Sequence, residues 1–219
     1  MEINEKNVYE LVKTIITQIE KGASEEGLVP VGISNRHIHL SKADVATLFG
    51  EGYALTPLKD LSQVGQFACK EQLTIIGPSM RAIEGVRVLG PERKASQVEV
   101  SLTDAYQLRL RPPVRESGNL SGSAPITIVG PKGVVTLKEG CIIANRHIHM
   151  SPAEAAQYGL KDFDRVTVEV VDATRPARWY GVQVRVHETF RLEMHVDTDD
   201  ANSVGMNPKT AKIRIIGKE

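Results

Sequence analysis

Two copies of one histidine-rich heptapeptide hold the residues of this chain that are best suited to chemistry. Residues 35–41 read Asn-Arg-His-Ile-His-Leu-Ser, and residues 145–151 repeat them with Met150 in place of Leu40. If each copy is extended, its two histidines project from the same face with Cα atoms about 6.6 Å apart. One metal ion can reach both imidazoles at that separation, and imidazole is the usual ligand for zinc and similar metals.

The first copy offers His37 and His39, and the second copy offers His147 and His149. A single His-x-His pair is commonly two ordinary histidines on the polar face of a strand. This chain, however, places four of its six histidines in two near-identical copies. We therefore interpret the two copies as two metal half-sites.

The remaining two histidines are candidates for a third ligand. His195 lies in a stretch whose alternate residues are apolar, so its side chain shares the polar face of an expected strand with Glu193. His187 follows the end of another expected strand. Periodicity alone does not choose between His187 and His195.

Three other polar residues are candidates for roles near the half-sites. Glu99 lies on the polar face of an expected strand, where an isolated acid is usually only solvated. Arg93 lies in a loop between two expected strands, and loops held by a rigid scaffold often carry function. Ser117 offers a hydroxyl and nearby backbone N–H groups to an oxyanion, although the general polarity of loops is the stronger explanation.

The composition limits the classes of partner. The 219 residues include 27 Lys plus Arg and 27 Asp plus Glu, so the chain as a whole has no charge that favours nucleic acid or an anionic membrane. An anionic ligand must therefore be bound by local arginines. No apolar run approaches the roughly 18 residues of a membrane span. The two cysteines, Cys69 and Cys141, are too few for a disulfide framework and suit a reducing cytoplasm.

The first element expected along the chain is an amphipathic helix within residues 1–21. Apolar residues recur there at steps of three and four, from Val8 to Ile19, with polar residues on the opposite face. Residues 22–27 then form a flexible linker. Such a helix either docks on its own domain or serves as an address for another protein.

From Leu28 onward the chain is typical of short strands separated by glycine and proline. Ser41 and Ser151 each begin a short helix, and no other internal helix is expected. Many short strands with so few helices predict a mainly β protein, and the duplication suggests two related barrels. The expected strands cover residues 29–33, 72–76, 85–89, 97–102, 106–111, 126–129, 134–137, 165–171, 178–186, 190–196 and 212–216.

With its doubled motif, the chain resembles the PduL-type phosphate propanoyltransferases, which are phosphotransacylases of bacterial microcompartments. The likeness runs from about Val29 to the C-terminal end of the sequence. The segment Leu89-Gly90-Pro91-Glu92-Arg93 and the residues around Glu99 are also similar to that family. The amphipathic segment and its linker resemble the family's encapsulation peptide.

The resemblance implies two small β-barrel domains with short capping helices, between which the chain crosses at the two repeats. Residues 28–36 would then belong with residues 145–219 in one barrel, and residues 37–144 would form the other. It also implies a location in a bacterial microcompartment within the cytoplasm, with residues 1–21 binding shell or core proteins. The oligomeric state is left open, a homo-oligomer included.

The resemblance further implies an enzyme with two zinc ions per chain, which transfers a short acyl group between coenzyme A and inorganic phosphate. Arg93 would contact the phosphate, and Ser117 would belong to the same site. The six implied zinc ligands form two sets, which are His37, His39 and Glu99 for one ion and His147, His149 and His195 for the other.

This chemistry suits the residues. A free thiol has a pKa of about 8.5 and is mostly protonated at neutral pH, whereas zinc coordination deprotonates it. A site with three protein ligands leaves one zinc position open for that sulfur. We expect direct transfer between two bound reactants, with an acyl-enzyme on Cys69 or Cys141 as the alternative.

Two other classes of function stay open at this point. A zinc-dependent hydrolase would use the same ligands, with water in place of phosphate as the nucleophile. A non-catalytic metal-binding scaffold module would depend on the N-terminal segment more than on the site.

Overall fold

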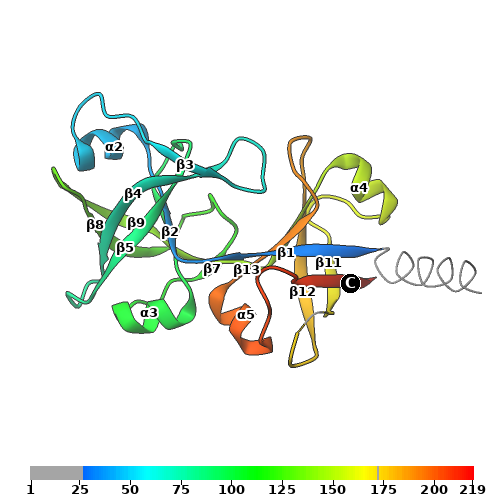
Figure 1. Cartoon of the computed structure of the whole chain (residues 1–219). Helices are drawn as coiled ribbons and strands as arrows, with labels where there is room; N and C mark the ends of the chain where they lie inside the picture. The colour runs from blue at the N-terminus through cyan, green and yellow to red at the C-terminus, as the bar shows by residue number, and fades with distance from the viewer. Residues whose placement is uncertain (1–26, 172) are drawn as a thin grey trace, which may run out of the picture.

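The computed structural model describes residues 27–171 and 173–219 of the chain. The protein is mainly β, as predicted, and its strands form two closed six-stranded barrels that lie side by side (Figure 1). The predicted N-terminal helix and most of its linker lie outside the described residues.

One barrel, here called the terminal barrel, combines the first described strand with the last five. Its strands follow one another around the ring in the order β1-β13-β10-β12-β11-β14. They are β1 (Leu28–Ser34), β10 (His147–Met150), β11 (Arg165–Val170), β12 (Ala177–Val186), β13 (Glu193–Asp197) and β14 (Lys212–Lys218).

The other barrel, here called the central barrel, is closed by the pairing of β8 with both β4 and β9. Two short strands extend it, since β3 (Pro57–Asp60) pairs with β4 and β7 (Val114–Arg115) pairs with β9. The strands of the ring are β2 (His37–His39), β4 (Phe67–Ile76), β5 (Ala82–Gly90), β6 (Gln97–Glu99), β8 (Ala124–Val129) and β9 (Val134–Ala144).

The chain passes from one barrel to the other at each histidine motif. β1 pairs with β13 in the terminal barrel, whereas β2, which begins three residues after β1 ends, pairs with β5 and β6 in the central barrel. In the same way β9 belongs to the central barrel and β10 to the terminal barrel. Both motifs therefore lie where the two barrels meet (Figure 1).

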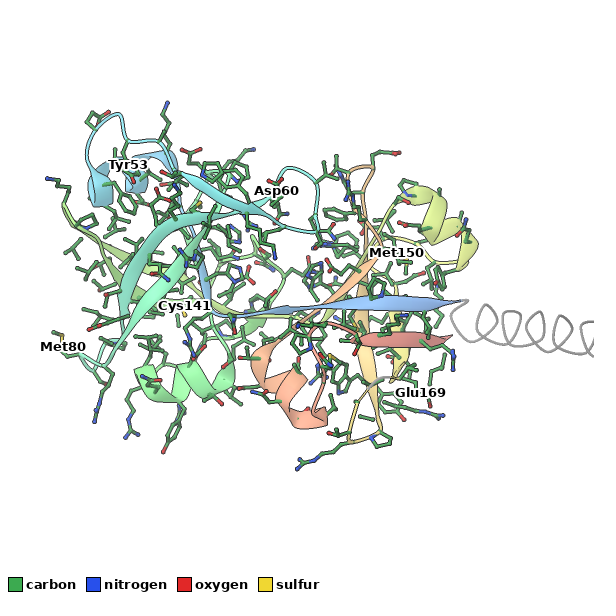
Figure 2. All side chains as sticks on the ribbon, viewed as in Figure 1. Tyr53, Asp60, Met80, Cys141, Met150 and Glu169 are labelled. Carbon is green, nitrogen blue, oxygen red and sulfur yellow. The ribbon has the colours of Figure 1, made fainter. Side chains whose placement is uncertain are left out.

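Alternation along the motif strands explains which way their side chains point. Ile38 and Ile148 are fully buried, and each packs in the hydrophobic core of its own barrel. Because successive side chains of a strand point to opposite faces, the flanking histidines point away from these cores. Met150 and Cys141 mark the two cores in Figure 2, and both are fully buried.

Four short helices lie within the described residues, where only two were expected. Ser41 and Ser151 cap α2 (Lys42–Phe49) and α4 (Pro152–Gln157), which confirms both predicted helix starts. The other two are α3 (Leu102–Leu108) and α5 (Thr198–Val204).

The prediction of a strand at residues 106–111 is wrong, because α3 covers the first three of these residues. The strand predicted at residues 97–102 ends at Glu99. The reason is a capping box, in which Ser101 and Asp104 bond each other's backbone N–H groups and begin α3. Asp197 caps α5 in a similar way by accepting a hydrogen bond from Asp200 N. The cap at Ser101 is the local signal that the alternating pattern at residues 106–111 concealed. The cap at Asp197 begins a helix that the sequence analysis did not predict.

Candidate functional site

The first histidine motif gains a neighbour from β6. Ligand atoms of His37, His39 and Glu99 all lie within 4.8 Å of one another. The register explains the grouping, because His37 lies directly opposite Glu99 in the antiparallel pair of β2 and β6. His37 Nε2 is 3.5 Å from Glu99 Oε2.

The second motif gains its neighbour from β13. His147, His149 and His195 form an equivalent group, and His147 lies directly opposite His195 in the register of β10 and β13. His187 lies outside this group, where it contacts Thr189. The geometry thus brings His195, and not His187, to the second motif.

The two groups are related by an internal repeat that is longer than the heptapeptide. Glu99 and His195 occupy the same position opposite the first histidine of each motif. The sequences around them correspond as well, since residues 97–105 read QVEVSLTDA and residues 193–201 read EMHVDTDDA. Aligning these segments was the signal in the sequence that could have selected His195.

Backbone contacts orient one ring in each motif. His37 Nδ1 lies 2.8 Å from Asn35 O, and His147 Nδ1 lies 2.7 Å from Asn145 O. Such a bond turns Nε2 toward the rest of the group and fixes the tautomer in which Nε2 has a free lone pair.

Buried ring nitrogens without partners test whether these groups suit a metal. Among the described residues, His39 Nδ1, His149 Nδ1 and His195 Nε2 are buried and make no hydrogen bond, although Glu193 Oε2 lies 3.3 Å from His195 Nε2. Buried polar atoms are nearly always bonded, so unpartnered nitrogens within a cluster of imidazoles fit the ligands of a metal ion. Three nitrogen or oxygen donors are also the protein ligand set of catalytic zinc sites.

Burial controls protonation in the second group. Burial, together with the charge of the neighbouring His147, lowers the pKa of His149 to about 2 and that of His195 to about 3. Burial likewise lowers the pKa of His147. These rings are therefore neutral, which is the form that binds a metal.

The first group places an imidazole beside a carboxylate. Burial alone would lower the pKa of His37, but the charge of Glu99 and its hydrogen bond raise it above the usual value. Burial would raise the pKa of Glu99, but the charge of His37 and the bond to it hold that pKa far below the usual range. Glu99 is therefore an ionised carboxylate, which suits a divalent cation.

Arg93 and Ser117 lie beside the first group. Arg93 Nη1 donates to Ser117 Oγ at 2.8 Å, and Ser117 Oγ donates to Glu99 Oε1 at 2.9 Å. The backbone N–H of Arg93 donates to Leu40 O, which fixes the loop against the first motif. The structure thus brings together both residues that the sequence singled out for an anion.

The two histidine groups face one cavity of about 690 Å³. Both histidine groups line it, together with Arg93 and Ser117 and with residues from both barrels. The cavity is therefore formed only when the two barrels lie together.

The two cysteines lie elsewhere. Cys69 and Cys141 are fully buried, and burial raises the pKa of Cys69 to about 11 and that of Cys141 to about 12. Neither is among the residues of the described chain that line the cavity. The cysteine acyl-enzyme therefore has no support from this geometry, because a nucleophilic cysteine needs a lowered pKa.

The arginine of each motif has a structural role that sequence reasoning missed. Arg36 donates to Asp104 in α3, and Arg146 binds both carboxylate oxygens of Asp200 in α5. Each motif is thus fixed to the helix that follows its partner strand, because α3 follows β6 and α5 follows β13.

Glu116 links the barrels on another side of the cavity. It accepts hydrogen bonds from Gln183 at 2.5 Å and from Arg185 at 3.3 Å, both of which lie on β12. Gln183 also accepts from Asn145 of the second motif. No sequence pattern pointed to these residues, because the contacts join segments far apart in the chain.

Comparison with known proteins identifies the family. The phosphate propanoyltransferase family matches residues 30–207, which include both histidine motifs and all candidate ligands. The chain belongs to the phosphate propanoyltransferase family. The predicted resemblance is confirmed, and so is the prediction of an acyltransferase.

Individual members are similar over nearly their whole length. A phosphate propanoyltransferase of Lachnoclostridium phytofermentans is 55% identical over 202 residues, which are 91% of this chain and 94% of that protein. One from Thermotoga maritima is 56% identical over 183 residues, covering 84% and 86% of the two chains. One from Clostridioides difficile is 46% identical over 205 residues, covering 93% and 95%.

The remaining expectation concerns membranes. None of the helices in residues 27–171 and 173–219 is long and apolar enough to cross a membrane.

Proposed function

We propose that this member of the family transfers a short acyl group, propanoyl, between coenzyme A and inorganic phosphate, and that it does so with two zinc ions per chain. The observation that carries the proposal is the pair of three-residue groups that face one cavity beside Arg93. The names of the relatives, phosphate propanoyltransferase, support the same reaction.

His37, His39 and Glu99 would hold one zinc ion, and His147, His149 and His195 would hold the other. Zinc at such sites supplies a Lewis acid that keeps a thiol deprotonated and offsets the charge of phosphate. The unpartnered buried nitrogens and the neutral state of the second group support this assignment.

The protein's own residues would position the phosphate. The guanidinium of Arg93 can bind two phosphate oxygens as a planar fork, and Ser117 Oγ can orient the bound anion. A phosphate oxygen then forms a bond to the thioester carbonyl carbon as the carbon–sulfur bond breaks, giving acyl phosphate and the thiolate of coenzyme A. A cavity between the barrels holds both reactants together and limits competing attack by water.

The reaction is tested by following acyl-CoA cleavage with and without phosphate and by detecting acyl phosphate directly. We expect cleavage to require phosphate and to yield acyl phosphate and free thiol in equal amounts. Cleavage without phosphate would instead identify a hydrolase, and a zinc-loaded protein without any cleavage would identify a scaffold module. Metal analysis of the same sample should find about two zinc per chain, in line with two three-ligand sites.

We also propose that the protein works in a bacterial microcompartment, addressed by residues 1–21. The support is the amphipathic pattern from Val8 to Ile19 and the linker that follows it in the sequence. Fusing residues 1–27 to an unrelated protein should carry that protein into microcompartments. Ile15→Asp with Ile19→Asp should abolish this transport, and a fusion that stays outside would refute the address.

A further inference from the structure

Each histidine group has a fourth residue that completes a square of side chains on two paired strands. In the central barrel this residue is Gln97, which lies opposite His39. In the terminal barrel it is Glu193, which lies opposite His149. Gln97 and Glu193 therefore occupy equivalent positions beside the second histidine of each motif. Neither residue belongs to its three-residue group of candidate metal ligands.

Gln97 connects its group to a loop. It donates to Glu99 Oε1 at 2.5 Å and to Ser117 Oγ at 2.9 Å, and it accepts from Gly118 N at 2.7 Å. The loop that carries Ser117 is therefore held against the first group by the fourth residue of the square.

Glu193 connects its group to a different loop. Glu193 Oε2 lies 3.3 Å from His195 Nε2 and accepts hydrogen bonds from Ser62 Oγ and from Gln63 Nε2, the latter at 3.2 Å. Ser62 and Gln63 belong to residues 61–66, here called the 61–66 loop, which follows β3 of the central barrel. Figure 1 shows this loop reaching toward the terminal barrel.

Gln63 makes the connection specific. Its amide also donates to Arg191 O and accepts from Arg191 N, both at 3.2 Å, so all of its partners lie on or next to β13. The side chain is buried, with 3% exposure, although its loop lies at the surface. Within the described residues, no strand of the central barrel pairs with a strand of the terminal barrel. The bonds of Gln63 therefore link the two barrels through side chains at the site.

Glu193 is confined from its other side by β1. A Cβ atom added to Gly32 would lie 3.0 Å from Glu193 Oε1 and 3.3 Å from His195 Nδ1. Glycine at this position lets the Glu193 carboxylate fit between β1 and the 61–66 loop. The carboxylate is thus fixed in place rather than free to sample other rotamers.

From these contacts we propose that Glu193 is a positioning residue, which anchors the 61–66 loop across the cavity and so aligns the two histidine groups with each other. The 61–66 loop lines the cavity through Leu61, Ser62, Gln63 and Gln66. Loss of the anchor leaves both groups intact but lets their separation vary. The proposal rests on the proposed function, because the alignment matters only if both groups serve one reaction.

The test uses substitutions in the full-length protein. Gln63→Glu places a second carboxylate against Glu193 and should lower kcat roughly tenfold or more, since small misplacement of reacting groups is costly. Adding Glu193→Gln restores a donor and acceptor pair and should recover most of that loss. Zinc content should stay unchanged in every variant. Val64→Ala is the matched control, because Val64 lies in the same loop with its side chain exposed.

A second readout needs no turnover. The Arg191 N–H donates to Gln63 Oε1, so its hydrogen exchange should accelerate in Gln63→Glu, slow again in the double variant and stay unchanged in Val64→Ala. Glu193→Gln is also measured alone, and losses in Gln63→Glu and Glu193→Gln that simply add in the double variant, or normal exchange at Arg191, would overturn the anchor. A wild-type protein without phosphate-dependent transfer would refute the proposed function, and the exchange measurement would still decide whether the anchor exists.

Discussion

Arg93 shows how much a single side chain can contribute once its neighbours are known. Its Nη1 donates to Ser117 at 2.8 Å, and Ser117 in turn donates to Glu99, so the guanidinium faces the first group through a hydroxyl. Burial lowers the pKa of Arg93, while the charge of Glu99 opposes that shift. A partly desolvated guanidinium binds an anion more strongly than a fully solvated one.

We therefore predict that Arg93→Lys is far from conservative. Lysine retains the charge but loses the planar fork that holds two phosphate oxygens. The rate of acyl transfer should fall by about 10²-fold or more, in line with the loss of one positioned electrostatic donor. Steady-state kinetics with varied phosphate measure this. Unchanged phosphate saturation and turnover would remove Arg93 from the site.

The histidines outside the motifs give a matched pair of substitutions. His195 belongs to the second group, whereas His187 contacts Thr189 away from it. His195→Ala should lower the zinc content by about one per chain, because removing one ligand weakens a three-ligand site severely. His187→Ala should leave the zinc content unchanged. Metal analysis decides the question, and equal zinc in both variants would exclude His195 as a ligand.

At the scale of elements, each motif strand is fixed by an arginine to the start of a helix. Asp104 accepts from Arg36 and also takes part in the capping box of α3, with 2% of its side chain exposed. Asp200 accepts from Arg146 at the start of α5, with 19% of its side chain exposed. The strand that holds two histidines and the strand that supplies the third residue of the group are therefore joined twice, by the sheet and by this ion pair.

This difference in burial predicts a difference in stability. Asp104→Ala should lower the free energy of unfolding by about 2–4 kcal/mol, because it removes a helix cap and leaves a buried network without its acceptor. Asp200→Ala should cost less, because solvent screens its ion pair more fully. Urea denaturation measures both. Glu169→Ala, which breaks an exposed ion pair with Arg178, is the control and should change stability by less than about 0.5 kcal/mol.

At the scale of the whole molecule, the candidate site belongs to neither barrel alone. The cavity is lined by residues of both, and contacts of Glu116 and of the 61–66 loop join them around it. The terminal barrel also depends on β1, a strand that the chain supplies before it crosses into the central barrel. Folding of the terminal barrel and assembly of the site are therefore coupled.

Residues 1–26 precede the first described strand in the sequence. β1 begins at Leu28, and the described core of the terminal barrel takes its first residue, Val29, from this strand. A protein lacking residues 1–26 should retain its zinc, its melting temperature and its phosphate-dependent activity, and it should aggregate less, because an apolar stripe tends to self-associate. Calorimetry and the transfer assay check this. A large loss of stability would show that the segment is part of the fold.

Features that depend only on neighbouring residues could be predicted from the sequence alone. The doubled His-x-His spacing places both imidazoles of each motif on one face whatever lies around them, since strand alternation is a local property. Ser41 and Ser151 mark helix starts for the same reason, because a cap bonds backbone groups three residues away. The same local rules produced the error at residues 106–111, where alternation outweighed the capping box at Ser101.

Strand alternation and helix caps left open which distant residues complete each group, and apart from the family resemblance this depended on the tertiary structure. Glu99 and His195 join the motifs through cross-strand register, which depends on the pairing of segments 62 and 48 residues apart, as from His37 to Glu99 and from His147 to His195. The choice of His195 over His187, the contact between Arg93 and Ser117, and the reach of the 61–66 loop to Glu193 all arise in this way. Local patterns carry no information on register between distant strands, because it is set by the closure of each barrel as a whole.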